Sequence, residues 1–107
     1  MAGAKIVVIY PRPTDVDTFE RLYVEDHVPM VPKFPGITKF VQTKVVGTPT
    51  GATPPFHRLA ELHFPSMQVL QRAASSPEAN QAVAHAVSIS SGGAPIVLVC
   101  DESIMDF

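Results

Sequence analysis

The sequence has no tryptophan and a single cysteine, Cys100, among its 107 residues. One cysteine excludes a disulfide bond within the chain and every zinc motif that needs a pair of cysteines. Cys100 ends an apolar run and has no charged neighbour before Asp101, surroundings that are typical of an unreactive thiol. We therefore expect neither disulfide chemistry nor a cysteine nucleophile.

Clusters of positive charge are also missing. Eight lysine and arginine residues against ten aspartate and glutamate residues give a formal net charge of −2, with no basic run. Nucleic-acid grooves and membrane-surface patches need clustered positive charge. No segment approaches the roughly 18 apolar residues of a membrane span, and the opening MAGAKIVVIY lacks the apolar region and cleavage site of a secretory signal. We therefore expect a cytoplasmic protein without nucleic-acid or membrane partners.

What the sequence does contain is typical of a small globular domain. Hydrophobic residues make up 46% of the chain and charged residues 17%, which provides enough apolar material for a core. The length allows one domain, over residues 1–107, with no room for separate cofactor and substrate domains. A domain of this size still exposes much apolar surface, so covering one more face by dimerisation would stabilise it.

Four extended segments are predicted from apolar, β-branched runs bounded by proline or glycine. They cover residues 4–10, 37–46, 56–64 and 94–100. Three helical segments lie between them. The first begins near Asp15 and ends or kinks at Val28, because Pro29 disfavours a helical conformation for the residue before it. A short helix covers residues 67–74, and the last begins at Pro77 and ends before Gly92.

This β-α-β-β-α-β order predicts an α+β protein with a ferredoxin-like fold, in which helices cover one face of a four-stranded antiparallel sheet. The first and last strands read IVVI and IVLV and are apolar on both faces. An antiparallel sheet with one face in water should alternate apolar and polar residues instead. A second copy of the same sheet is the simplest cover, so we expect a homodimer with its two sheets face to face.

The stretch from Phe19 to Ile37 resembles the signature of the EthD family. In that signature a tyrosine and a histidine of the first helix precede a second strand led by Pro-Gly, as Tyr23, His27 and Pro35-Gly36 do here. The resemblance extends along the whole chain and implies a dimeric α+β barrel. Relatives in the wider superfamily include cofactor-free monooxygenases, lactone isomerases, and polyketide cyclases and decarboxylases. The family takes its name from a protein of bacterial ethyl tert-butyl ether degradation clusters, and its members are generally described as oxidoreductase-like. The resemblance therefore also implies an oxidoreductase-like role in small-molecule catabolism.

His27 is the first candidate for chemistry. Phe19, Tyr23 and His27 fall on one stripe of the first helix, which faces the sheet. An imidazole titrates near neutral pH, and Tyr23 lies one turn earlier on the same face, so the two suggest a catalytic proton-transfer pair. The alternative is a packed histidine that caps the last helical carbonyls. The family motif matches at His27 and implies a ligand-facing or catalytic role.

The third strand supplies a second set of candidates. By the two-residue period of a strand, His57, Leu59, Glu61 and His63 lie on one face. If that face is enclosed, Glu61 and His63 are close enough to share a substrate. The alternative is an ordinary polar face that meets solvent or the partner subunit. Three aromatic side chains are expected to form the wall of the pocket and to contact the substrate, namely Tyr10, Phe19 and Phe40.

Metal and cofactor signatures are not found. The histidines His27, His57, His63 and His85 come from separate elements, without an HxH or HxxxH pair. His85 also falls off the small-residue stripe of its helix, which is formed by Ala79, Ala82, Val83, Ala86 and Val87. The only paired glycines, Gly92 and Gly93, follow a helix and not a strand, so they read as a helix stop. We expect no metal, nucleotide or flavin.

Together these features suggest a homodimer with one apolar pocket per subunit that binds a small hydrophobic or aromatic metabolite. His27 would act there as general acid or base, in a cofactor-independent oxidoreductase (monooxygenase), decarboxylase or isomerase. Each of these reactions begins by moving a proton. The alternative is a non-catalytic small-molecule binding or accessory protein of a catabolic pathway, and a third reading is a structural dimer without a pocket. The sequence leaves open whether the chain is an enzyme.

Overall fold

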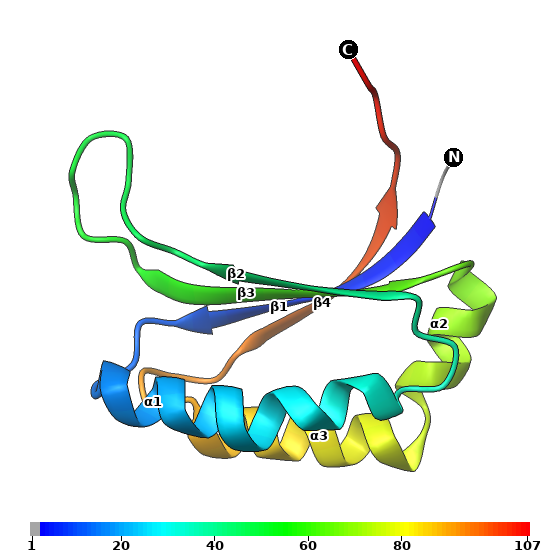
Figure 1. Cartoon of the computed structure of the whole chain (residues 1–107), viewed down its shortest axis with the longest axis horizontal. Helices are drawn as coiled ribbons and strands as arrows, with labels where there is room; N and C mark the ends of the chain where they lie inside the picture. Colours follow the sequence, from blue (N-terminus) through cyan, green and yellow to red (C-terminus); the bar gives the residue numbers. More distant parts are fainter. Residues whose placement is uncertain (1–2) are drawn as a thin grey trace.

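The computed structural model describes residues 3–107 and has two layers, a sheet and a layer of helices (Figure 1). The sheet is antiparallel throughout, in the order β2-β3-β1-β4. Its strands are β1 (Gly3–Pro11), β2 (Lys39–Lys44), β3 (Phe56–Phe64) and β4 (Ile96–Glu102). The helices are α1 (Val16–Leu22), α2 (Met67–Ala74) and α3 (Pro77–Ile89). The predicted ferredoxin-like fold is confirmed. Among the described residues, no helix is long and apolar enough to span a membrane.

Each helix begins at a short polar side chain that accepts a backbone N–H. Asp15 accepts from Thr18, Ser66 from Val69, and Ser76 from Ala79. Such caps satisfy N–H groups that have no partner within the helix. The predicted helix starts are confirmed, and these caps explain why each helix begins there.

The predicted end or kink of the first helix at Val28 corresponds to a change of helix type there, although the chain stays helical through Val28 and the α-helix itself ends earlier, at Leu22. After α1 the chain continues as a π-helical turn, η1 (Tyr23–His27), and then as a 3₁₀-helix, η2 (Val28–Lys33). Val28 has helical φ and ψ angles of −53° and −41°, and its N–H donates to the Tyr23 carbonyl five residues earlier. Pro29 then stands at the start of the 3₁₀-helix, where a missing N–H costs little. Wide turns of this kind are frequent at functional sites.

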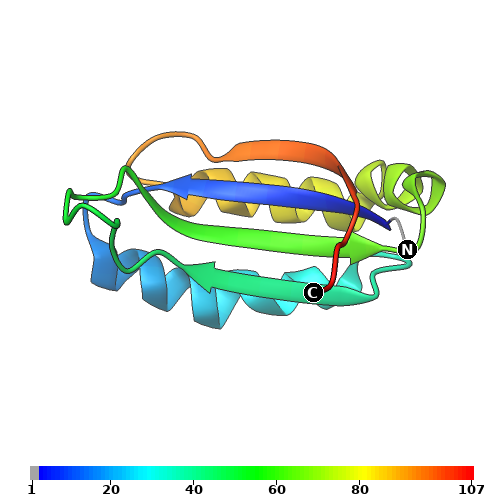
Figure 2. The same cartoon turned by 90° about the horizontal axis from the view of Figure 1, so that it is seen from above.

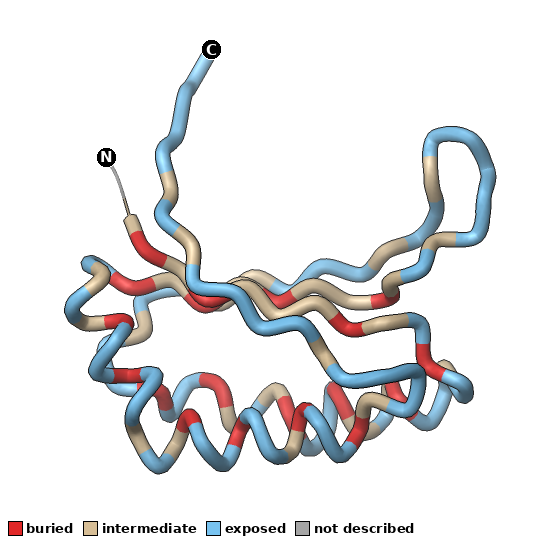
Figure 3. The backbone as a smooth tube through the Cα atoms, turned by 180° about the vertical axis from the view of Figure 1, so that it is seen from behind, coloured by how far each residue is buried: buried red, intermediate tan, exposed pale blue. Residues whose placement is uncertain are grey.

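The core fills the space between the sheet and the helices. Ile6 and Tyr10 of β1 and Leu62 of β3 point toward the helix layer and are buried there. They pack against Phe34 and Leu70 in one cluster, and against Phe19 and Tyr23 in the other. In Figure 3 the buried positions follow the inner sides of the helices and alternate along the strands.

The opposite face of the sheet is open. Val7 of β1 pairs with Leu98 of β4, and Ile9 pairs with Ile96. Ile96 and Leu98 are 41% and 44% exposed, and no described residue covers them. The β2–β3 loop and the C-terminal segment rise on this same side, away from the helices (Figures 1 and 3). We call this surface the open face; its apolar residues are Val7, Ile9, Val41, Leu59, Ile96 and Leu98.

Candidate functional site

A cavity of about 190 Å³ lies between the sheet and the helix layer. Its floor is the inner side of β1 and β3, and its walls are α3, η2 and β4. The alanines of α3 leave the space open, because a larger side chain at Ala82 or Ala86 would fill it. β4 forms one edge of the sheet (Figure 2), and the lining residues Val83, Val97 and Val99 are exposed. The cavity therefore opens between α3 and β4.

Tyr10 and His27 are the polar side chains among the residues that line this cavity. Both are buried, and the Tyr10 hydroxyl lies 3.2 Å from Nε2 of His27. Nδ1 of His27 in turn lies 3.0 Å from Nδ1 of His85. A hydrogen-bonded chain therefore runs from β1 through η1 to α3, and it ends at a half-buried side chain.

Burial controls the protonation of Tyr10 and His27. Loss of water around His27, followed by the nearby His85 ring, lowers the pKa of His27 to about 4. His27 is therefore neutral at pH 7. Burial raises the pKa of Tyr10 above its usual range, so this hydroxyl stays protonated. The cavity thus holds a neutral base beside a hydroxyl that can donate a hydrogen bond.

Tyr23 lies behind His27 and does not line the cavity. Its ring stacks against those of His27 and Phe19, at centroid distances of 5.8 and 5.6 Å. The guanidinium of Arg58 lies 4.9 Å from the Tyr23 ring centroid. The buried Tyr23 hydroxyl has no hydrogen-bond partner among the described residues, and burial raises its pKa to about 12. Tyr23 thus supports the His27 ring by stacking, whereas Tyr10 and His85 are the hydrogen-bond partners of that ring.

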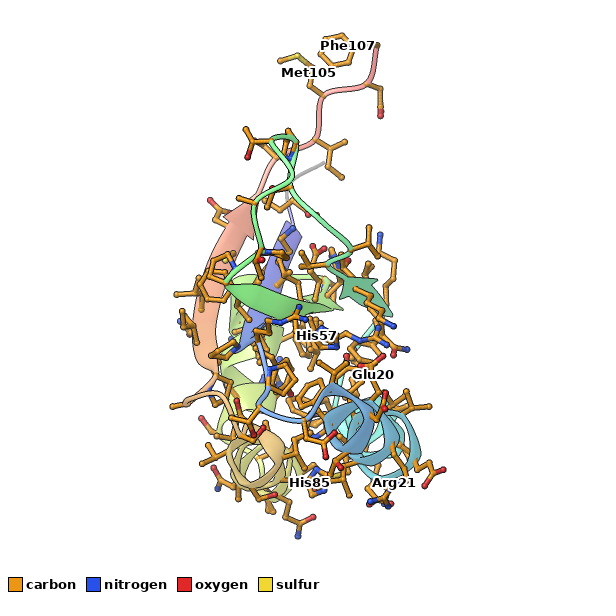
Figure 4. The ribbon with its side chains drawn as sticks, turned by 90° about the vertical axis from the view of Figure 1, so that its left-hand side faces the viewer. Glu20, Arg21, His57, His85, Met105 and Phe107 are labelled. Atoms are coloured by element: carbon orange, nitrogen blue, oxygen red, sulfur yellow. The ribbon has the colours of Figure 1, made fainter. Side chains whose placement is uncertain are left out.

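Glu20 organises a second polar group, on the far side of Tyr23 from the cavity. Its carboxylate accepts two hydrogen bonds from Arg58, at 2.7 and 3.0 Å, and lies 3.2 Å from Nε2 of His57. Lys44 is 3.4 Å away. Figure 4 shows Glu20 and His57 together above α1, and His85 apart from them between the helices. The hydrogen bonds from Arg58 lower the pKa of Glu20 to about 2.

We expect Glu20→Gln to destabilise the protein by about 2 to 3 kcal/mol at pH 7. The pKa of Glu20 falls from 4.5 to about 2 on folding, so its contribution is complete above pH 4.5 and is lost as the pH falls from 4.5 to 2. Urea unfolding across this range should give a flatter stability profile for the variant. Glu25→Gln, at an exposed position of the same helical segment, is the control. Equal stability of the two variants would contradict the assignment.

Glu61 and His63 lie on the open face, across the sheet from His27. Lys5 binds Glu61 and Glu102 there, at 2.5 and 2.9 Å. Nε2 of His63 is 3.6 Å from Glu61, and its Nδ1 is 3.8 Å from Glu102. Glu61, His63 and Glu102 bring ligand atoms within 4.8 Å of one another, a spacing that suits a metal ion, but the Lys5 ammonium already bridges the two carboxylates.

His57 is on the helix side of the sheet, so its predicted grouping with Glu61 and His63 is wrong. Pro11 pairs with Phe56 and Tyr10 pairs with Arg58, which leaves His57 as an extra residue in β3. A bulge of this kind breaks the two-residue alternation. His57 therefore turns inward and contacts Glu20 and the edge of the Phe19 ring.

The structure brings three of the predicted site residues to the cavity, namely Tyr10, His27 and Phe40. Phe19 and Tyr23 lie one layer behind, and Glu61 and His63 lie on the other face. The sequence prediction left out His85. Helical periodicity did not single it out, because His85 lies beside the small-residue stripe of α3 and not within it.

Comparison with known proteins shows the family of the chain. The family model for the EthD domain matches residues 11–87, which include most of the cavity wall. The chain belongs to the EthD family. A protein of Rhodococcus erythropolis, an 11.0 kDa protein from the thcB–thcC intergenic region, is 29% identical over 101 residues, which are 94% of this chain and 97% of that protein. An EthD family protein from Bacillus halodurans is 23% identical, with a TM-score of 0.82 over 96% of this chain and 99% of that one.

More distant structures share the fold of this EthD chain. A dimeric ferredoxin-like protein from Thermobifida fusca has a TM-score of 0.68 at 8% identity, covering 96% of this chain and 92% of that one. SnoaB from Streptomyces nogalater, a cofactor-independent oxygenase, has a TM-score of 0.59 at 9% identity, covering 99% and 95%. At such low identity these likenesses concern the fold alone.

Proposed function

We propose that this EthD protein binds a small apolar or aromatic metabolite in its cavity and that His27 moves a proton on that ligand. The observation that carries the proposal is the single polar pair, Tyr10 and His27, in a wall that is otherwise apolar. Ligand sites typically combine apolar walls with a few converging polar groups. A role in cytoplasmic small-molecule catabolism, as the family resemblance implies, is part of this proposal.

The cavity limits the ligand to a small molecule. Its volume of about 190 Å³ exceeds the roughly 150 Å³ of an apolar protein cavity that binds benzene. A substituted single ring or a branched aliphatic ether therefore fits. The walls away from Tyr10 and His27 offer no side-chain hydrogen bond, so a second polar group on the ligand would be left unpaired. We infer a ligand with its polar atoms gathered at one end.

His27 would act as general base in the first step. At neutral pH its imidazole is uncharged and can take a proton from an acidic C–H or O–H of the ligand. The Tyr10 hydroxyl would donate to the oxygen on which negative charge develops. Oxygenation and isomerisation without a cofactor start in this way, whereas in a decarboxylation the proton is added to the carbon after CO2 leaves. The likeness to SnoaB supports the first of these, by analogy of fold only.

A homodimer is part of the proposal. The open face carries an apolar surface that a second copy would bury, and similar structures include dimeric ferredoxin-like proteins. Face-to-face packing of two such sheets excludes water from both. The β2–β3 loop and the C-terminal segment, which rise on the same side, would then lie against the partner.

We expect Ala82→Phe to abolish ligand binding, because the new ring fills the cavity. The measurement is thermal unfolding with a panel of small phenols and branched ethers, since a ligand that binds the folded state raises the melting temperature. Ala84→Phe, at an exposed position of the same helix, is the matched control and should respond like the unchanged protein. Stabilisation that survives in Ala82→Phe would place the ligand elsewhere.

His27→Gln separates an enzyme from a binding protein. For any ligand that the panel identifies, product formation should fall by about 100-fold or more while binding is retained, since proton transfer by a positioned group contributes roughly that much. Binding without product in the unchanged protein would contradict the catalytic part of the proposal and favour a non-catalytic binding protein.

A further inference from the structure

We propose that His85 is a positioning residue that works through His27 and relays a proton between the cavity and solvent. The inference rests on the proposed role of His27. It concerns a residue that is outside the cavity wall, and it starts from the 3.0 Å contact between the Nδ1 atoms of the two rings.

The two rings meet edge to edge. Their planes are nearly parallel, at 9°, and their centroids are 5.2 Å apart, whereas the facing Nδ1 atoms are only 3.0 Å apart. An imidazole N–H lies in the plane of its ring, so one Nδ1–H can point at the lone pair of the other Nδ1. Two bare nitrogens, or two N–H groups, at this distance would repel each other. The contact therefore holds one proton, on one side or the other.

The hydrogen bond to Tyr10 couples this proton to the cavity. In one state the Tyr10 hydroxyl donates to Nε2 of His27, and Nδ1–H of His27 donates to Nδ1 of His85. In the other state Nε2–H of His27 donates to the Tyr10 oxygen, and Nδ1–H of His85 donates to Nδ1 of His27. Both rings are neutral in both states, and only the positions of the protons differ.

Passage from the first state to the second moves one proton out of the cavity. Nε2 of His27 gains the proton that the ligand loses, the Nδ1 proton of His27 passes to Nδ1 of His85, and the Nε2 proton of His85 passes to water. The Tyr10 hydroxyl is then free to donate to the ligand anion. One proton leaves the ligand and one enters solvent, so charge and atoms balance. The reverse passage returns a proton to the ligand.

Burial is the physical reason for such a relay. His27 is only 6% exposed, and an imidazolium there would lack both water and a counterion. The groups that contact its ring are Tyr10 from β1, Tyr23 from its own helix and His85 from α3, and none of them carries a negative charge. The carboxylate of Glu20, paired with Arg58, lies beyond Tyr23, and those of Glu25 and Asp26 are exposed to solvent. Handing the Nδ1 proton to half-buried His85 avoids a buried charge.

The test uses the complete chain, labelled with nitrogen-15 and without a ligand. Imidazole NMR should show one ring protonated at Nδ1 and the other at Nε2, with a coupling between the two Nδ1 atoms through the shared proton. His85→Gln keeps a hydrogen-bonding side chain but cannot relay a proton. It should slow the solvent exchange of the buried His27 N–H by about tenfold or more, and added free imidazole should restore the rate in His85→Ala.

His63→Gln, on the open face, is the control and should leave the His27 signals and exchange rate unchanged. Protonation of both rings at Nε2 alone would overturn the relay, as would faster exchange in His85→Gln, which would mark His85 as a mere cover over His27. Because no ligand is used, a failed relay is distinct from a failure of the proposed function. If NMR shows the shared proton but no small molecule of any panel binds, the relay is supported, whereas the proposed binding of a small metabolite is contradicted.

Discussion

We expect a Leu98→Arg variant to be a monomer at micromolar concentration, where the proposed homodimer of the unchanged protein should sediment as a dimer. Leu98 is 44% exposed and stands beside Val7 on the open face, the surface proposed to pack against a second copy. The two-fold symmetry of a homodimer introduces the new charge twice, once from each copy. Each buried guanidinium would lack a partner, at a cost of several kcal/mol, so the dissociation constant should rise by about three orders of magnitude.

Val87→Arg is the control for this experiment. Val87 is 53% exposed on α3, in the helix layer and away from the open face. It should leave the sedimentation coefficient unchanged, since the arginine remains in water. A Leu98→Arg protein that stays dimeric would show that a different surface mediates association. A monomeric unchanged protein would remove the proposed dimer altogether.

A Gly92→Ala variant will lose about 3 kcal/mol of stability. Gly92 lies after α3, against the connection between β1 and α1. A Cβ atom there would be 1.9 Å from the Arg12 carbonyl oxygen and 2.8 Å from its carbon. Both are backbone atoms that follow directly after β1, so they cannot move aside without shifting the strand end that carries Tyr10. For a domain of this size the melting temperature should fall by about 10 to 20 °C.

Gly47→Ala is the matched control, because a Cβ atom at Gly47 meets nothing within 4 Å. Its melting temperature should stay the same or rise slightly, since alanine reduces the freedom of the unfolded chain. If the two variants have the same melting temperature, the Arg12 backbone can shift without loss of stability. The close packing of Gly92 would then not be a source of stability. The sequence prediction of a helix stop at Gly92 and Gly93 did not include this close approach.

The order of the elements followed from local sequence, although two strands differ in their bounds, with β2 at Lys39–Lys44 and β4 at Ile96–Glu102. The strand predicted over residues 56–64 and the helix predicted over residues 67–74 have the same bounds in the structure. Proline, glycine and capping serines act on their immediate neighbours, so a single sequence contains the information that places them. The stripe of Phe19, Tyr23 and His27 is inward-facing for the same reason, because helical periodicity fixes relative direction along one element.

The site required contacts between elements, and these were only partly predictable. His27 and Tyr10 were named from the sequence, yet nothing local says that the Tyr10 hydroxyl reaches Nε2 of His27 or that His85 meets Nδ1. Glu61 was expected near the substrate, but its strand turns it to the open face with Lys5. Register between strands decides such placements, and register depends on the packing of the whole sheet.

The sequence by itself determined the elements, their order, the two-faced apolar sheet and the family to which the chain is similar. Only the tertiary structure decided which polar groups share the cavity. The bulge that turns His57 inward and the π-helical turn that precedes Pro29 were likewise visible only in the structure. The same is true of the approach of α3 that sets His85 against His27. Local propensity acts over a few residues, whereas a site is assembled from residues that are distant in the chain and adjacent in space.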